Sequence, residues 1–365
     1  MTSQDEHFIS HNSMVYLSEL VLAPLSRARV ALKQKVFGLN DRQFGNLLQM
    51  AHLNHVVVRG LNALRVVNCG DADIARTQQV EDALEAEHAR IATAMHVLHQ
   101  VCDALEHRGH CAVVIKSLDH WPDLGSDLDL YTDSDPGVIC EFMTRHFRAM
   151  VAPRSWGDRL AGKWNFLLPG LPEAFEIHIG RLGQTGEQAV IASSLVERSR
   201  LVEICSHTFR VPSVYDRIMI STLQRMYRHF YFRLCDVLDT ALLAETGMLD
   251  YEELRYRSME AGIWEGVATY LAIVSDYVDT YRGIDPELPN IIKTSARFGG
   301  DKIFYRDGFL RIPIMPESAG LYRSQLAGVF KNGKLQNCAR LSLLPWLASA
   351  AVLGQKLTGS DKGIW

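Results

Sequence analysis

The chain has 365 residues, of which 47% are hydrophobic and 22% charged, so it can bury a large core. This composition excludes a disordered chain, a fibrous repeat and a small disulfide-stapled protein. The formal net charge of −4 disfavours a nucleic-acid binder, because neutralising phosphates needs a surplus of Lys and Arg.

The charge is unevenly distributed along the chain. Residues 281–365 carry 12 Lys or Arg against 6 Asp or Glu, a net of +6, which leaves the rest of the chain acidic. A basic segment of this kind can fold over an acidic site and meet an anionic substrate. Lys302, Arg306 and Arg311 are the residues from which we expect such contacts.

Targeting and redox signals favour a cytoplasmic protein. The seven cysteines are widely spaced and contain no Cys-x-x-Cys pair, which favours reduced thiols over a disulfide framework or a zinc site. The first residues are acidic where a signal peptide would be basic. The longest apolar run, residues 341–354, is shorter than the roughly 20 residues that span a bilayer, and Pro345 interrupts it. We therefore expect no transmembrane segment.

Residues 1–108 are predicted to form an N-terminal helical region. Apolar residues recur at helical spacing from Phe44 to Leu64, and Asp41 can cap the helix that they predict. A longer helix is predicted over residues 75–107, because its apolar positions step by threes and fours until Gly109 ends the pattern.

Residues 109–211 combine predicted strands with a helix. Cys111–Ile115 is a short β-branched run typical of a buried strand, and Asp127–Tyr131 alternates polar and apolar residues. Asp135 and Pro136 can start a helix that runs to about residue 150. Residues 164–168 and 175–179 are predicted to pair as two further strands. Mixed α and β structure is therefore expected here.

The remaining sequence again predicts mostly helix. Residues 212–280 form a second helical region, in which the apolar steps from Met219 to Ala241 predict one helix of about seven turns. Residues 281–365 form a basic extension with a hairpin, in which residues 302–305 and 309–313 flank a turn at 306–308. The fold class expected is α+β, with a small mixed sheet flanked by N- and C-terminal helical regions.

The most informative motif is an Asp-x-Asp doublet on the second predicted strand. Asp127 and Asp129 point to one face of that strand, while Leu128 and Leu130 point to the other and can enter the core. Two carboxylates about 7 Å apart on one face repel each other unless a cation lies between them. Mg²⁺ prefers such oxygen ligands and commonly bridges them to substrate phosphates.

A third carboxylate stands on a later predicted strand. In residues 175–179 the apolar residues alternate with Glu176 and His178, so a charged residue lies on the polar face of an otherwise apolar strand. If this strand neighbours the Asp127 strand, three carboxylates converge. Such a site can activate a hydroxyl for attack and neutralise the charge of a leaving pyrophosphate. That chemistry is nucleotidyl transfer.

With these motifs the sequence resembles the polymerase-β-like nucleotidyltransferase superfamily, and within it a family of uncharacterised bacterial nucleotidyltransferases. The superfamily pattern is a strand, a Gly-Gly or Gly-Ser turn, about ten residues, Asp-x-Asp and a later acidic strand. Here Lys116-Ser117 occupies the turn and nine residues precede Asp127. The Lys is similar to the Lys-Gly variant of the uncharacterised family, and Glu176-Ile-His178 is similar to its Asp-Leu-His strand. Arg233 and Asp236 match its helical region, so the resemblance spans roughly residues 45–280.

The resemblance implies a Mg²⁺-dependent enzyme whose catalytic domain is residues 109–211. It implies two metal ions on Asp127, Asp129 and Glu176, which are the catalytic and metal-binding residues. A nucleoside triphosphate such as ATP is the donor, and a small molecule or a protein supplies the acceptor hydroxyl; nucleic acid is disfavoured as a partner. The nucleotide contacts expected are Lys116, Ser117, Ser126 and His178.

Other interpretations of these residues remain open. Asp-x-Asp also holds a metal in glycosyltransferases that use nucleotide sugars, although several βα units usually precede it there. A nucleotidyltransferase-like scaffold that binds without catalysis is a further alternative, favoured by the Lys in place of a glycine turn. Among nearby charges, Asp123 is expected to act as a turn or cap residue. Lys163 is expected to be a solvated loop charge, and Arg233 can pair with Asp236 on one helix.

Overall fold

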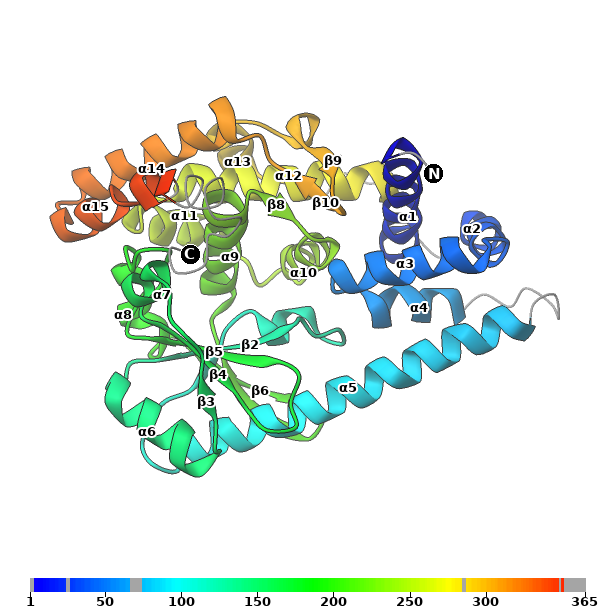
Figure 1. The fold of residues 1–365 in the computed structure, drawn as a ribbon. Helices are drawn as coiled ribbons and strands as arrows, with labels where there is room; N and C mark the ends of the chain where they lie inside the picture. Colours follow the sequence, from blue (N-terminus) through cyan, green and yellow to red (C-terminus); the bar gives the residue numbers. More distant parts are fainter. Residues whose placement is uncertain (1–2, 24–26, 66–73, 284–286, 348, 351–365) are drawn as a thin grey trace.

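The computed structural model describes residues 3–23, 27–65, 74–283, 287–347 and 349–350. The fold is α+β, with a mixed seven-stranded sheet flanked by N- and C-terminal helices (Figure 1). In the described residues, no helix is both long and apolar enough to cross a membrane.

The N-terminal region is helical, as expected. It consists of α1 (Ser3–Leu22), α2 (Arg27–Phe37), α3 (Asp41–Leu53), α4 (Val57–Arg65) and α5 (Ile74–Glu106). The single helix predicted over residues 41–64 is wrong, because the chain breaks at Asn54. The buried Asn54 amide donates to the Met50 and Gly308 carbonyls, and its oxygen accepts from the Leu234 N–H. Gly308 and Leu234 lie far along the chain, so sequence periodicity cannot report that they hold Asn54 at this break.

The seven-stranded sheet has the order β3-β4-β5-β2-β1-β7-β6. Its central pair, β2 and β5, is parallel, and Asp129 lies directly opposite Glu176. β1 pairs antiparallel with β2 and parallel with β7, whereas β4 is antiparallel to β5. The strands are β1 (Val113–Val114), β2 (Asp127–Thr132), β3 (Met150–Val151), β4 (Lys163–Leu167), β5 (Ala174–Ile179), β6 (Arg200–Ile204) and β7 (His207–Val211).

The two faces of the sheet meet different helices. Leu128 and Leu130 are fully buried in a cluster with residues of α5 and of α6 (Pro136–His146). α5 lies along the side of the sheet opposite the C-terminal helices (Figure 1). Tyr131, on the opposite face, belongs to the core formed with the N- and C-terminal helices. Asp127 and Asp129 therefore point toward the helical regions, as strand alternation predicts.

The long helix predicted over residues 219–241 is wrong. α9 (Val214–Thr222) continues into the π-helical segment η2 (Leu223–His229), after which Phe230 adopts a left-handed conformation with φ +55°. Strand β8 (Tyr231–Phe232) follows, and α10 (Leu234–Glu245) begins only then. β8 pairs antiparallel with β10 (Phe309–Arg311), about 80 residues later in the sequence. Apolar side chains continue through the break, so helical spacing alone conceals it.

The predicted C-terminal hairpin is present. β9 (Phe304–Arg306) pairs with β10 around the turn residues Asp307 and Gly308, which both have positive φ as a two-residue hairpin turn requires. With β8 the hairpin forms a three-stranded sheet. The remaining helices are the short α7 (Trp156–Ala161) and α8 (Ala189–Leu195), then α11 (Tyr251–Glu260), α12 (Trp264–Arg282), α13 (Asn290–Ser295), α14 (Ala319–Lys331) and α15 (Leu335–Leu341).

Candidate active site

A polar cavity of about 270 Å³ lies between the sheet and the C-terminal helical region. One wall carries the predicted acidic residues together with Lys116, Ser117, Ser126 and Lys163. The other wall comes from η2 and the residues after it, and it carries Gln224, Arg225, Arg228, His229, Tyr231 and Arg233. His55 and His120 also line the cavity. We call the first the acidic wall, which carries three carboxylates and two lysines, and the second the cationic wall, which carries three arginines.

The carboxylates of Asp129 and Glu176 meet because β2 and β5 are paired in register. Atoms of Asp129, Glu176 and His178 that could bind a metal all lie within 4.8 Å of one another. Asp127 stands at the exposed start of β2 and lines the same cavity. The carboxylate oxygens and the imidazole nitrogen of this group could hold a metal ion.

Lys116 occupies an unusual turn at the end of β1. Its backbone has φ +67° and ψ −53°, and the Ser117 N–H donates to the Ile115 carbonyl at 2.8 Å, which defines a classic γ-turn. This conformation is rare for a residue with a side chain and costs of order 1 to 3 kcal/mol. In this turn the Lys116 ammonium lies 2.5 Å from Asp129 Oδ1 and 3.8 Å from Glu176 Oε1.

Ser117 fixes this turn to the acidic strand. Its hydroxyl donates to the Asp127 carbonyl and accepts from the Asp129 N–H at 2.8 Å. The side chain is buried and its hydroxyl is engaged by the β2 backbone. Ser126 is exposed, and its hydroxyl lies 3.5 Å from a carboxylate oxygen of Asp127.

Glu176 has three cationic or N–H partners. Lys163 lies 3.0 Å from Oε2, His178 Nε2 donates to Oε1 at 2.9 Å, and the Lys116 ammonium lies 3.8 Å from Oε1. Lys163 also pairs with Asp158 at 3.1 Å and is buried, so its expected role as a solvated loop charge is wrong. The available signal was its place beside the predicted strand 164–168, which was expected to pair with the Glu176 strand.

The two paired carboxyls differ in their electrostatics. Burial raises the pKa of Asp129 to about 7; the Lys116 ammonium opposes the rise and Glu176 adds to it. Burial acts in the same direction on Glu176, but Lys116, His178 and Lys163 outweigh it and hold its pKa well below the usual range. Glu176 therefore stays ionised. Burial lowers the pKa of His178, so the ring is neutral at pH 7.

The cationic wall was missed by sequence reasoning, except for Arg233. Within the described chain, Arg225 Nη1 and Arg233 Nε are buried without hydrogen-bond partners. The predicted pairing of Arg233 with the Asp236 side chain is wrong, because Arg225 forms that ion pair at 2.8 Å. Asp236 instead accepts the backbone N–H of Arg233. The available signal was the polar stripe formed by positions 224, 225, 228 and 229 in an otherwise apolar segment.

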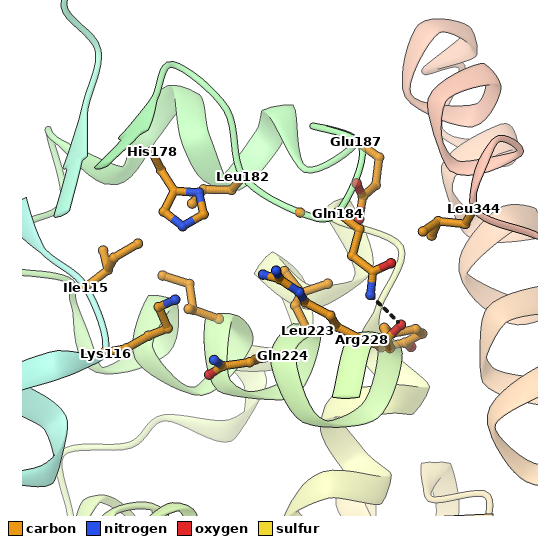
Figure 2. A pocket seen from close by; sticks show the side chains of 13 residues that line it. Ile115, Lys116, His178, Leu182, Gln184, Glu187, Leu223, Gln224, Arg228 and Leu344 are labelled. Atoms are coloured by element: carbon orange, nitrogen blue, oxygen red, sulfur yellow. Dashed lines mark hydrogen bonds between the residues drawn. The ribbon is translucent and has the colours of Figure 1, made fainter. Parts of the chain in front are cut away.

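A smaller cavity of about 50 Å³ adjoins the first and shares Lys116, Gln224 and Arg228 with it. His178 lines this smaller cavity. Figure 2 shows the Lys116 ammonium and the Arg228 guanidinium pointing into the cavity from opposite walls. Two cations directed at one space provide a place for an anion. Leu182, Leu223 and Leu344 make the rest of this cavity largely apolar.

Residues of the basic extension reach the edge of the site. The Arg311 guanidinium lies 5.1 Å from the ring centre of Tyr231, which lines the polar cavity. Arg306 pairs with Asp307, and Lys302 pairs with Asp301. Of the three basic residues expected near an anionic substrate, the structure therefore brings Arg311 beside a residue of the cavity.

Comparisons with known proteins find a distant likeness. No family model matches the sequence, and no curated protein matches it. One similar solved structure is that of an antigenic nucleotidyltransferase-like protein from Paracoccidioides brasiliensis. The identity is 12%, the TM-score is 0.35, and the match covers 56% of this chain and 93% of that chain.

Proposed function

We propose that the chain transfers a nucleoside monophosphate from a nucleoside triphosphate to an acceptor hydroxyl. The observation that carries the proposal is the polar cavity itself, in which Asp127, Asp129 and Glu176 face Arg225 and Arg228. The carboxylates suit divalent cations, and the arginines suit the phosphates that those cations accompany.

The groups of the cavity have distinct proposed roles. Asp127, Asp129 and Glu176 would hold Mg²⁺, which would supply charge neutralisation for the phosphates. Lys116 would then turn from Asp129 toward the triphosphate. The guanidinium of Arg228 neutralises the departing pyrophosphate.

The reaction forms one bond and breaks one. The acceptor oxygen bonds to the α-phosphorus, and the bond from that phosphorus to the oxygen bridging to the β-phosphate breaks. Pyrophosphate leaves with the electron pair, and the hydroxyl proton passes to a carboxylate of the acidic wall. His178 keeps Glu176 oriented through its 2.9 Å hydrogen bond.

The acidic character of the chain and the size of the cavity favour a small-molecule or protein acceptor over a nucleic acid. The experiment is to incubate the full chain and Mg²⁺ with each of the four triphosphates and a pool of hydroxyl compounds and proteins. Pyrophosphate release with a product heavier by one nucleoside monophosphate supports the proposal. Asp129→Asn should abolish both signals, whereas the exposed Asp103→Asn should leave them unchanged. Failure of every triphosphate to bind would overturn the proposal.

A second function is favoured by one observation, the Lys116 ammonium at 2.5 Å from Asp129. This ammonium occupies the position that a catalytic metal ion would take. It would therefore suit a protein that binds nucleotides without catalysis. Triphosphate binding without pyrophosphate release for any acceptor would select this binding scaffold. Consumption of a nucleotide sugar, when one replaces the triphosphates in this assay, would instead indicate a metal-dependent glycosyltransferase.

A further inference from the structure

A second group of metal-ligand side chains lies at the edge of the polar cavity. His55 comes from the break between α3 and α4, His120 from the 3₁₀ turn η1 (Ser117–His120), and Cys235 from the first turn of α10. Their ligand atoms all lie within 4.8 Å of one another. Three segments far apart in the sequence therefore present two imidazoles and one thiol to a single point.

The His120 ring is held in the orientation that a metal ligand needs. Its Nδ1 lies 2.5 Å from an Asp239 carboxylate oxygen, which turns Nε2 toward Cys235 Sγ at 3.9 Å. Asp239 is itself held by Arg59 at 2.7 Å. Metal-binding histidines almost always donate their second nitrogen to a carboxylate or carbonyl in this way.

His55 is the third member of the group. Within the described chain its Nδ1 is buried and has no hydrogen-bond partner. Its backbone has φ +52°, and its ring lies edge-on to His120 with centres 5.6 Å apart. Gly125 makes room for the ring, because a Cβ there would stand 3.1 Å from the His55 Cε1 atom.

Charges of both signs surround the group: Arg225 and Arg233 act on His55 from the cavity side, and a carboxylate lies behind His120. Arg59 pairs with both Asp123 and Asp239, so these three side chains leave one negative charge. Cys235 is a free, fully buried thiol, and its thiolate would add a second. Two imidazole nitrogens and a thiolate form a softer donor set than the carboxylates of β2 and β5, one that suits Zn²⁺ rather than Mg²⁺.

We propose that His55, His120 and Cys235 bind a zinc-class transition-metal ion, separate from the acidic site. His55 and His120 line the polar cavity whereas Cys235 does not, so the fourth coordination position opens toward the cavity. Three protein ligands with one open position is the arrangement of metal sites that take water or a substrate group. The wide spacing of the cysteines predicted no zinc site. That prediction considered cysteines close in the sequence, whereas this group combines one cysteine with two histidines from other segments. This site does not depend on the proposed nucleotidyl transfer.

The test is titration of the chelator-treated full chain with Co²⁺ alone. We expect a thiolate-to-cobalt charge-transfer band that saturates at one Co²⁺ per chain when excess Mg²⁺ occupies the acidic site, and displacement of that Co²⁺ by Zn²⁺. Cys235→Ser should abolish that band, and the exposed Cys205→Ser should leave it intact. Asp239→Asn should keep the band but weaken binding roughly 10- to 100-fold. Gly125→Ala should also weaken binding, by displacing the His55 ring.

His55→Ala provides a second ligand variant if Cys235→Ser does not fold, as judged by circular dichroism. Asp129→Asn separates the two proposals, because it should abolish nucleotidyl transfer and leave the cobalt band unchanged. Absence of stoichiometric Co²⁺ binding would overturn the metal site. Saturating Co²⁺ that never produces the thiolate band, or a band that persists in both Cys235→Ser and His55→Ala, would overturn it as well.

Discussion

The ammonium of Lys116 lies 2.5 Å from a carboxylate oxygen of Asp129, in the space where two carboxylates of neighbouring strands converge. A lysine thus neutralises a site whose donor atoms also fit a divalent cation. Lys116 also has a strained backbone, with φ +67°. Substitutions at this residue can therefore test the effect of its charge and the cost of its conformation separately.

Removing the Lys116 ammonium should make the acidic wall bind Mg²⁺ more tightly in the absence of nucleotide. Without the competing cation, the affinity of Lys116→Ala for Mg²⁺ should rise by roughly tenfold, because a nearby like charge no longer repels the ion. Its affinity for the triphosphate should fall. Isothermal titration with Mg²⁺ and with the nucleotide measures both, and a parallel loss of the two affinities would contradict the placement of Lys116 between them.

The γ-turn predicts a difference between two variants that both lack the ammonium. Lys116→Gly should be more stable than Lys116→Ala by about 1 to 3 kcal/mol, because glycine adopts positive φ without the penalty imposed by a Cβ. The free energy of unfolding in urea measures the difference. Equal stabilities would mean that the turn relaxes at no cost.

Arg228 lines both cavities, so its loss should weaken triphosphate binding specifically. We expect Arg228→Ala to raise the KM for the nucleotide by roughly 10- to 100-fold, the value of one or two charge-assisted hydrogen bonds. The matched control is Arg255→Ala, an exposed arginine on α11 that pairs with Glu252. Similar kinetics for the two variants would remove Arg228 from the proposed site.

His229 should make the protein less stable in acid. Burial and four nearby cations lower its pKa to about 2, so the folded protein keeps it neutral. The unfolded chain protonates this residue below about pH 6.5, and stability therefore falls as the pH drops from about 6.5 toward the folded pKa. The cations are Arg228, Arg225, Lys116 and Arg233.

Urea denaturation at pH 5 and pH 7 measures this effect. His229→Gln should lose less stability than the wild type between these pH values, whereas the exposed His107→Gln should behave like the wild type. Tripolyphosphate should reduce the acid sensitivity of the wild type, because its charge offsets the surrounding cations. An unchanged pH dependence in His229→Gln would contradict the lowered pKa.

Asp123 should be structurally important, although the sequence indicated only a turn or cap residue. It is buried, accepts the Val58 N–H at 2.6 Å and pairs with Arg59 at 2.7 Å. Asp123→Ala should cost about 3 kcal/mol, because it leaves a buried donor and a partly buried charge without this partner. Asp103→Ala, on the exposed face of α5, should change the free energy of unfolding by less than about 0.5 kcal/mol. Equal effects in thermal or urea denaturation would contradict this role.

The local sequence determined the elements that carry the acidic residues. Strand alternation was enough to predict that Asp127 and Asp129 share a face and that Leu128 and Leu130 enter the core. Turn chemistry at Asp307-Gly308 was enough to predict the hairpin. The pairing of β2 with β5 in register entered the sequence argument only as a condition, because strand order depends on contacts between distant segments.

What the tertiary structure alone decided is which side chains meet. The strand β8 interrupts a helical pattern because β10, about 80 residues later, supplies its hydrogen bonds. That interruption directs Arg228 and its neighbours toward the acidic strands, and it places Cys235 beside two histidines from other segments. Periodicity reports the face that a residue presents within its own element. The partner across a cavity is fixed by long-range packing and backbone pairing, which leave no local signal in the sequence.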